Sequence, residues 1–118
     1  MIRVKVKRDS HDNPVLVEIR GHALFAPQGA DIVCAGVSVL AQTVVYAMEE
    51  LLGLSPPVKL KKGYLSLCRP AQLDVDKKEH FNLLFETMLL GIREVARSYP
   101  KYISVEQAEK VWEEEKND

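Results

Sequence analysis

Cys34 and His22 are the residues of this chain whose side chains could carry nucleophilic catalysis. A thiolate attacks a carbonyl carbon, and an imidazole beside it takes up the thiol proton and later donates it to the leaving group. Asp31 fits the N-cap of an apolar helix starting at Ile32, so Cys34 would lie in the first helical turn. The free N–H groups and the dipole at that helix end favour the thiolate. His22 lies across a loop from this helix end, and the loop could bring it to Cys34.

Position alone leaves other roles open for these residues. Cys34 also fits a small apolar residue in a core helix. The charge of Asp31 opposes a thiolate beside it, unless Asp31 orients or charges His22. Ser38 lies one turn after Cys34 on the same helical face, where it either lines the site or bonds back to a helix carbonyl.

The other cysteine and the other histidines show no pattern typical of a chemical site. Cys68 ends an apolar strand and is expected to be a buried small hydrophobe. His11 falls in a polar turn and His80 at the start of an amphipathic helix, so both are expected to be solvated surface residues. Two cysteines in 118 residues are too few for a disulfide scaffold or a structural zinc site. We therefore expect that the protein binds no metal and no cofactor. We also expect it to be located in the cytoplasm.

The elements that must position this pair follow from the hydrophobic periodicity. Apolar and basic residues alternate over 2–7. Val15, Val17 and Ile19 repeat this period, with Glu18 and Arg20 facing the other way, so two strands buried on one face are predicted. Turn-forming residues fill 9–14 between them and predict an antiparallel hairpin. Residues 23–30 have no clear period and are expected to form a loop.

A long apolar helix is predicted from Ile32 to about Leu52, ending at Gly53. Three polar residues interrupt its most apolar part, 32–48, which is also shorter than the roughly 20 residues of a membrane-spanning helix. A buried helix is therefore the better interpretation. Because the helix is apolar nearly all round, it needs cover on more than one side, and a second subunit could supply part of that cover.

The second half of the chain repeats this alternation of strands and helix. We expect the following elements: short strands at 58–60 and 64–68, an extension of the sheet at Leu73 and Val75, an amphipathic helix over 81–99, a last strand at 102–105, and an acidic tail over 106–118 that is helical or frayed. The order predicts one α+β domain over 1–118, a two-layer sandwich with two main helices on one face of a mainly antiparallel sheet. Sixteen basic and 17 acidic residues leave a net charge of -1, which argues against direct nucleic-acid binding by the chain as a whole.

One family shares the motif around the candidate pair. Gly21-His22-Ala23, then Gly29, Asp31-Ile32-Val33-Cys34-Ala35 and Ser38 resemble the signature of the bacterial ribosomal-processing cysteine proteases of the Prp type. The alternating first strand, the long apolar helix and a second helix ending in Tyr99-Pro100 extend the resemblance over most of the chain. Gly36 departs from it, because many relatives have a second alanine there.

This resemblance implies an activity and roles for individual residues. It implies that His22 and Cys34 form the catalytic pair of a homodimer that removes an N-terminal extension from a large-subunit ribosomal protein through an acyl-enzyme. The loop over 23–30 would be mobile and shape the substrate site, with Gly21 and Gly29 as hinges. Asp31 and Ser38 would support the pair. Backbone N–H groups at the helix start, including that of Cys34, are expected to stabilise the oxyanion.

Two other functions stay open. The chain could be a non-catalytic, ribosome-associated assembly factor that binds ribosomal protein or RNA. The residues for that role would be the basic ones at Arg3, Lys5, Lys7, Arg8, Lys59, Lys61 and Lys62, although a solvated strand face with edge lysines is the better interpretation of them. The same Cys-His pair would also serve a thiol-dependent acyl transferase or a hydrolase of small molecules.

Overall fold

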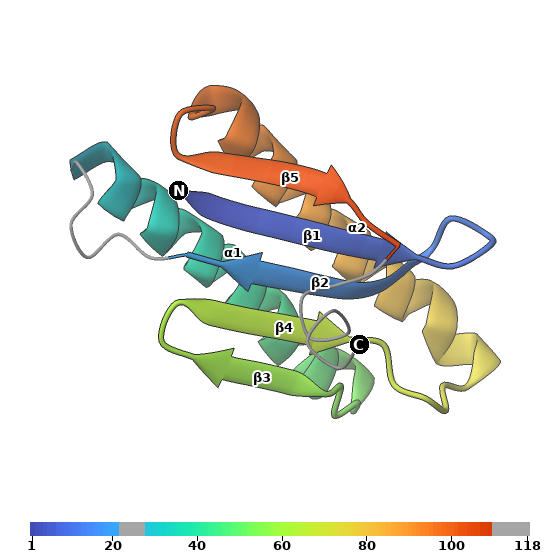
Figure 1. Cartoon of the computed structure of the whole chain (residues 1–118). Coiled ribbons are helices and arrows are strands. Elements are labelled where there is room, and N and C mark those ends of the chain that lie inside the picture. Colours follow the sequence, from blue (N-terminus) through green and yellow to red (C-terminus); the bar gives the residue numbers. More distant parts are fainter. Residues whose placement is uncertain (22–27, 110–118) are drawn as a thin grey trace.

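A computed structural model describes residues 1–21 and 28–109, and of residues 28–31 the backbone alone. Its elements in chain order are β1 (Ile2–Arg8), β2 (Pro14–Arg20), α1 (Gln28–Leu52), β3 (Val58–Lys61), β4 (Tyr64–Cys68), α2 (Val75–Ser98) and β5 (Ile103–Gln107). Both helices pack together on one face of a five-stranded sheet, and the part of the chain described leaves the other face without a helix (Figure 1). The predicted α+β two-layer sandwich is confirmed.

The strands are ordered β3-β4-β2-β1-β5 across the sheet. Three of the four strand pairings are antiparallel, and β5 runs parallel to β1. The period of two in β1 directs Ile2, Val4 and Val6 into the core, where they are buried. The basic residues between them therefore lie on the face opposite the helices.

The helix α1 covers the sheet through apolar residues spaced three and four apart. Its buried residues are Val33, Val37, Ala41, Val44, Val45 and Met48. By length and composition alone, Ile32–Leu52 would also suffice to cross a membrane, with a mean hydropathy of 1.6. Core helices pass the same test, and the buried residues of α1 belong to one core cluster with β1, β2, β4 and α2.

The helix α2 begins six residues earlier than the apolar period predicts. Its buried residues, Phe81, Phe85, Met88, Leu89 and Ile92, match the predicted core face. The carbonyl of Asp74 accepts hydrogen bonds from the N–H groups of Lys77 and Lys78, both at 3.0 Å, so helical bonding starts there. The expected sheet extension at Leu73 and Val75 is wrong, because Val75 is the first residue of α2 and is 87% exposed. The polar first turns of α2 project beyond the core and so carry no apolar period.

The last strand is longer than its apolar residues indicate. β5 includes Glu106 and Gln107, because its parallel pairing with β1 continues as far as the pair Val6 and Gln107. The acidic tail therefore begins inside the sheet. Residues 110–118 lie outside the described part of the chain, so the expectation that they are helical or frayed stays a prediction.

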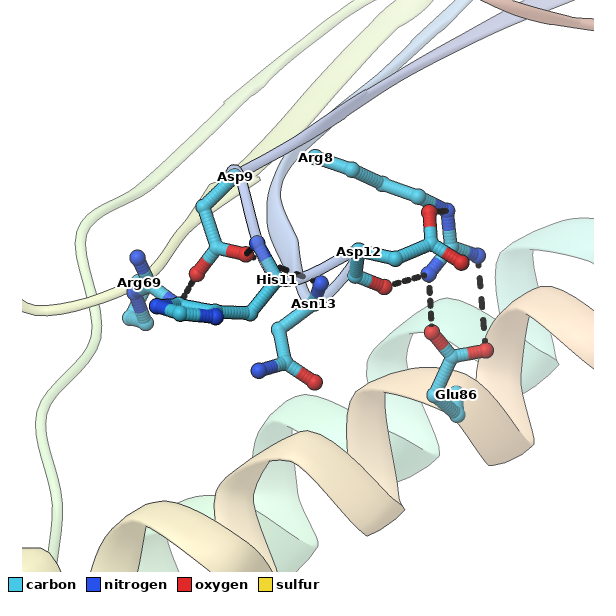
Figure 2. A network of polar contacts seen from close by, with 7 residues as sticks. All are labelled: Arg8, Asp9, His11, Asp12, Asn13, Arg69 and Glu86. Carbon is cyan, nitrogen blue, oxygen red and sulfur yellow. Dashed lines mark hydrogen bonds and ion pairs between the residues drawn. The ribbon is translucent and has the colours of Figure 1, made fainter.

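Polar contacts hold the β1–β2 turn at one end of the sheet (Figure 2). The Asp9 carboxylate accepts hydrogen bonds from the backbone N–H groups of His11 and Asn13, and from the guanidinium of Arg69 at 3.0 Å. The bond from the Asn13 backbone contributes most to lowering the pKa of Asp9 to about 2. Arg8 donates to the Glu86 carboxylate on α2. The hairpin is thus tied both to the chain after β4 and to the helix layer.

Candidate active site

The helix that carries Cys34 starts earlier than expected. α1 begins at Gln28, so 28–30 are helical, Gly29 lies in the first turn rather than in a loop, and Asp31 is inside the helix instead of being its N-cap. The sequence contains a signal for this start in Pro27, because proline lacks the N–H that a helix start leaves free.

This earlier start changes the surroundings of the thiol. Cys34 lies in the second turn of α1, where its amide is bonded to the carbonyl four residues before it. Gln28 lies about 9 Å before Cys34 along the helix axis, at 1.5 Å per residue. The free N–H groups of the first turn are therefore not next to the thiol, and the expected role of the Cys34 amide as an oxyanion donor is wrong.

Cys34 lies at a pocket between α1 and one end of the sheet, with a volume of about 120 Å³. The end concerned is the one where β1 begins and β2 ends, opposite to the β1–β2 turn (Figure 1). The inner wall of the pocket consists of the buried apolar residues Ile2, Ile19, Ala41 and Leu65. Gly21 and Ser38 also line it, and the β3–β4 hairpin contributes Leu60, Lys61, Gly63 and Tyr64.

Gly21 connects this pocket to the candidate general base. It lines the pocket and directly precedes His22 in the sequence. Its N–H donates to the carbonyl of Gly63 at 2.9 Å, which joins the end of β2 to the β3–β4 turn. His22 itself and the side chain of Asp31 lie outside the described residues, so their predicted roles stay predictions.

Among the side chains of α1 that the structure describes, Ser38 is the hydroxyl that lines the pocket with Cys34. It lines the same pocket, one helical turn after the half-buried cysteine. Its Oγ accepts a hydrogen bond from Nε2 of Gln42 at 2.7 Å. This bond uses an acceptor position of the hydroxyl and leaves its proton available for donation toward the pocket.

Tyr64 and Lys61 are pocket residues that the sequence did not point to. The predicted short strands around a turn at 61–63 locate the hairpin, but periodicity does not state which strand β4 joins. The pairing of β4 with β2 brings Tyr64 opposite Arg20. The Tyr64 hydroxyl donates to the fully buried carboxylate of Glu18 on β2, which anchors the hairpin beside the pocket.

The remaining cysteine and histidines lie away from this pocket. His11 and His80 are exposed, as predicted. Cys68 is half-buried rather than buried, and its thiol donates to the carbonyl of Arg69 at 3.4 Å. Within the described ranges, no three His, Cys, Asp or Glu side chains lie close enough to hold a metal ion.

A larger depression of about 1090 Å³ lies at the other end of the sheet, around the Arg8–Glu86 ion pair. Its central charged groups already bind one another, and neither Cys34 nor Ser38 lines it. The Cys34 pocket is therefore the better candidate for the active site.

Known proteins share both the sequence and the fold of this chain. The family model described as cysteine protease Prp matches residues 1–104. The ribosomal processing cysteine protease Prp of Bacillus subtilis is 34% identical over 108 residues, which cover 89% of this chain and 96% of that protein. The crystal structure of SMU.848 from Streptococcus mutans is 31% identical and superposes with a TM-score of 0.80, covering 91% of this chain and 93% of that one.

A second solved structure agrees in fold. The ribosomal processing protease Prp from Staphylococcus aureus, crystallised with a substrate peptide, has a TM-score of 0.80 at 24% identity, covering 92% of this chain and all of that one. Together with the half-buried thiol at a pocket, these matches define the chain as a cysteine protease. It belongs to the Prp family.

Proposed function

We propose that this chain removes an N-terminal extension from a large-subunit ribosomal protein, with Cys34 as nucleophile and His22 as general base. The observation that carries the proposal is the pocket that brings Cys34 together with Gly21, the residue directly before His22, in a member of the Prp family. The name of the Bacillus subtilis relative supports ribosomal processing as the activity. Such processing would take place in the cytoplasm, where ribosomal subunits are assembled.

The proposed reaction follows from the groups at the pocket. His22 takes the proton of Cys34, and the sulfur attacks the scissile carbonyl carbon. The C–N bond breaks as His22 returns the proton to the leaving amine, which leaves an acyl-enzyme. Water, deprotonated by His22, then hydrolyses the thioester and frees the thiol. Ser38 can donate a hydrogen bond toward the pocket, and Asp31 is proposed to orient His22. The reaction needs no cofactor.

The outer side of the helix layer supports a homodimer. Ile32, Val39 and Tyr46 are spaced seven residues apart on α1 and are all exposed. Residues at this spacing lie on the same side of a helix. Leu83 and Leu90 repeat the pattern on α2 and are exposed as well. Exposed rows of apolar residues on both helices are typical of an interaction site, and a second copy of the chain would cover them.

The activity is tested on precursors of the host's large-subunit ribosomal proteins that carry N-terminal extensions. We expect the wild-type chain to shorten one of them, as measured by mass spectrometry. Cys34→Ala should abolish cleavage while leaving the fold intact, and Cys68→Ala is the matched control that should cleave normally. Cleavage retained in Cys34→Ala would refute the assignment of the nucleophile.

Selective alkylation provides an independent measurement on the same pair of thiols. If Cys34 is the nucleophile, iodoacetamide should modify it well before Cys68 at neutral pH, and His22→Ala should slow that reaction. Equal and slow modification of both cysteines would contradict the proposal.

A further inference from the structure

The edge strand β3 presents free backbone groups beside the Cys34 pocket. β3 is the last strand of the sheet and pairs with β4 on one side only. In an antiparallel pair, residues alternate between those that exchange hydrogen bonds with the partner strand and those that do not. The bonding register of β3 therefore decides which of its amides point outward.

A hydrogen bond just beyond the strands fixes that register. The N–H of Cys68 donates to the carbonyl of Pro57 at 3.0 Å, so these two residues occupy a hydrogen-bonded position of the ladder, although Pro57 has no N–H to donate in return. The alternation continues with Lys59 opposite Ser66 and Lys61 opposite Tyr64 as bonding pairs. The N–H and C=O groups of Val58 and Leu60 consequently point away from β4, and they have no hydrogen-bond partner within the residues described.

The β3 edge of the sheet borders the Cys34 pocket. Leu60 and Lys61 line this pocket, and the described lining residues include none from β5, the strand at the other edge. The inner wall of the pocket is buried, but Leu60 is 64% exposed. Among the described residues that line the pocket, the exposed ones are Leu60 and Lys61 at the end of β3. A polypeptide that reaches Cys34 from that side passes along this strand.

We infer that β3 binds the substrate polypeptide as an added sixth strand, through the outward N–H and C=O groups of Val58 and Leu60. The inference rests on the proposed function, since the occupant is the polypeptide that the protease cleaves. An extended chain supplies N–H and C=O groups at every second residue, which matches the spacing of these two residues. An unfolded segment has these groups free along its whole length, so we expect the substrate to be an unfolded segment such as a terminal extension.

The two faces of β3 add a side-chain preference to this backbone pairing. Val58 and Leu60 point toward the helix side, and Lys59 and Lys61 toward the other face. Peptide residues directly opposite Val58 and Leu60 have their side chains on the apolar helix side. The substrate is therefore expected to be apolar at these alternate positions and polar between them, in either strand direction.

Backbone methylation of the substrate tests the pairing without altering the protein. A fluorogenic peptide spanning the cleavage site of the precursor is methylated at one amide nitrogen at a time. Methylation removes a donor, so we expect KM to rise roughly two- to tenfold at two positions separated by one residue, with no rise at the residue between. kcat at saturation should change little at these positions. A scan without this period of two would overturn the inference.

Amide hydrogen exchange tests the same groups from the side of the protein. In Cys34→Ala, the N–H groups of Val58 and Leu60 should exchange rapidly without peptide and at least tenfold more slowly with saturating peptide. The amides of Lys59 and Lys61 already bond to β4 and serve as internal controls that should change much less. Unchanged exchange at Val58 and Leu60 with bound peptide would refute strand addition.

A pair of enzyme variants separates the backbone donor from the side chain. Leu60→Pro removes the outward N–H, whereas Leu60→Ala keeps it and only shortens the side chain. We expect a larger rise in KM for Leu60→Pro than for Leu60→Ala; equal KM values would count against the pairing.

The outcomes distinguish this inference from the proposed function. Absence of cleavage of the unmodified precursor by the wild-type protein would refute the proposed function, whereas normal cleavage without these backbone effects would refute strand addition alone.

Discussion

Gly21 shows how strongly a single residue controls this site. Its φ of +123° belongs to a backbone region that residues with a Cβ rarely adopt, and an added Cβ would lie 2.5 Å from the carbonyl oxygen of Met1. Gly21 also bonds to Gly63 and lines the Cys34 pocket. Position 21 must therefore be glycine for steric reasons, whether or not this residue also acts as a hinge for the loop that follows.

We predict that Gly21→Ala lowers the free energy of unfolding by on the order of 2 kcal/mol, because the backbone must leave its positive φ or displace β1. The same displacement would shift the residue that precedes His22, so kcat/KM should fall as well. Urea unfolding and peptide cleavage measure the two effects.

Two other glycines provide matched controls for this substitution. Gly53 also has a positive φ, of +65°, but among the described atoms the nearest to its added Cβ is Lys77 Nζ at 3.9 Å. Gly53→Ala should therefore cost about 1 kcal/mol and spare cleavage. No atom of the described residues lies within 4 Å of a Cβ added at Gly36, so Gly36→Ala should stabilise α1 by up to about 1 kcal/mol. An equal decrease in the free energy of unfolding in all three variants would contradict the steric explanation for Gly21.

At the scale of elements, polar contacts hold the β1–β2 hairpin at the end of the sheet remote from the Cys34 pocket. The Asp9 carboxylate binds the turn backbone and the Arg69 guanidinium beyond β4 (Figure 2). The pKa of Asp9 is lowered to about 2 from an ordinary value of 3.8. A carboxylate with a lowered pKa stabilises the fold above its unfolded-state pKa, and this contribution is lost as the pH falls through the folded-state value.

We predict that Asp9→Asn is less stable than the wild type at pH 6 and that the difference disappears between about pH 4 and pH 2. The side-chain amide of this variant still offers an oxygen that accepts hydrogen bonds from the turn, but it lacks the negative charge that Arg69 binds. Urea unfolding at a series of pH values measures the difference. Asp12→Asn is the control, because the Asp12 side chain is 90% exposed and its loss should matter less. A difference that persists unchanged at pH 2 would exclude the ionised carboxylate as its source.

At the scale of the whole molecule, the described helices leave apolar residues exposed on the layer's outer side. Ile32, Val39 and Tyr46 of α1 do not belong to the core, although α1 was predicted to be apolar nearly all round. The core of one copy thus covers only one side of this helix. A second subunit on the other side is the proposed explanation for the rest of its apolar surface.

We predict that Val39→Glu converts the proposed dimer to a monomer, raising its dissociation constant by about a hundredfold or more, because an unpaired buried carboxylate costs several kcal/mol. Sedimentation velocity at several concentrations measures this. Val75→Glu is the control: Val75 is also exposed, at 87% against 64% for Val39, but it is the first residue of α2. A wild-type chain that sediments as a monomer throughout would refute the dimer.

Local patterns determined most of the elements of this protein. Alternation located β1 and β2, and the apolar period located the core face of α2 at Phe81, Phe85 and Met88. These predictions succeed because an element that is buried on one face shows a regular spacing of apolar residues in the sequence. They fail at element ends, as at Gln28 and Val75, because helical turns that project beyond the core need no apolar residues.

The sequence by itself determined the chemistry that is available: a cysteine and a histidine in a family motif, and the strands and helices around them. Only the tertiary structure decided which other residues meet Cys34. Tyr64, Leu60 and Lys61 reach the pocket because β4 pairs with β2, a contact between segments more than 40 residues apart in the pair of Arg20 and Tyr64. Long-range pairing of this kind depends on how whole layers pack, and no local period encodes it.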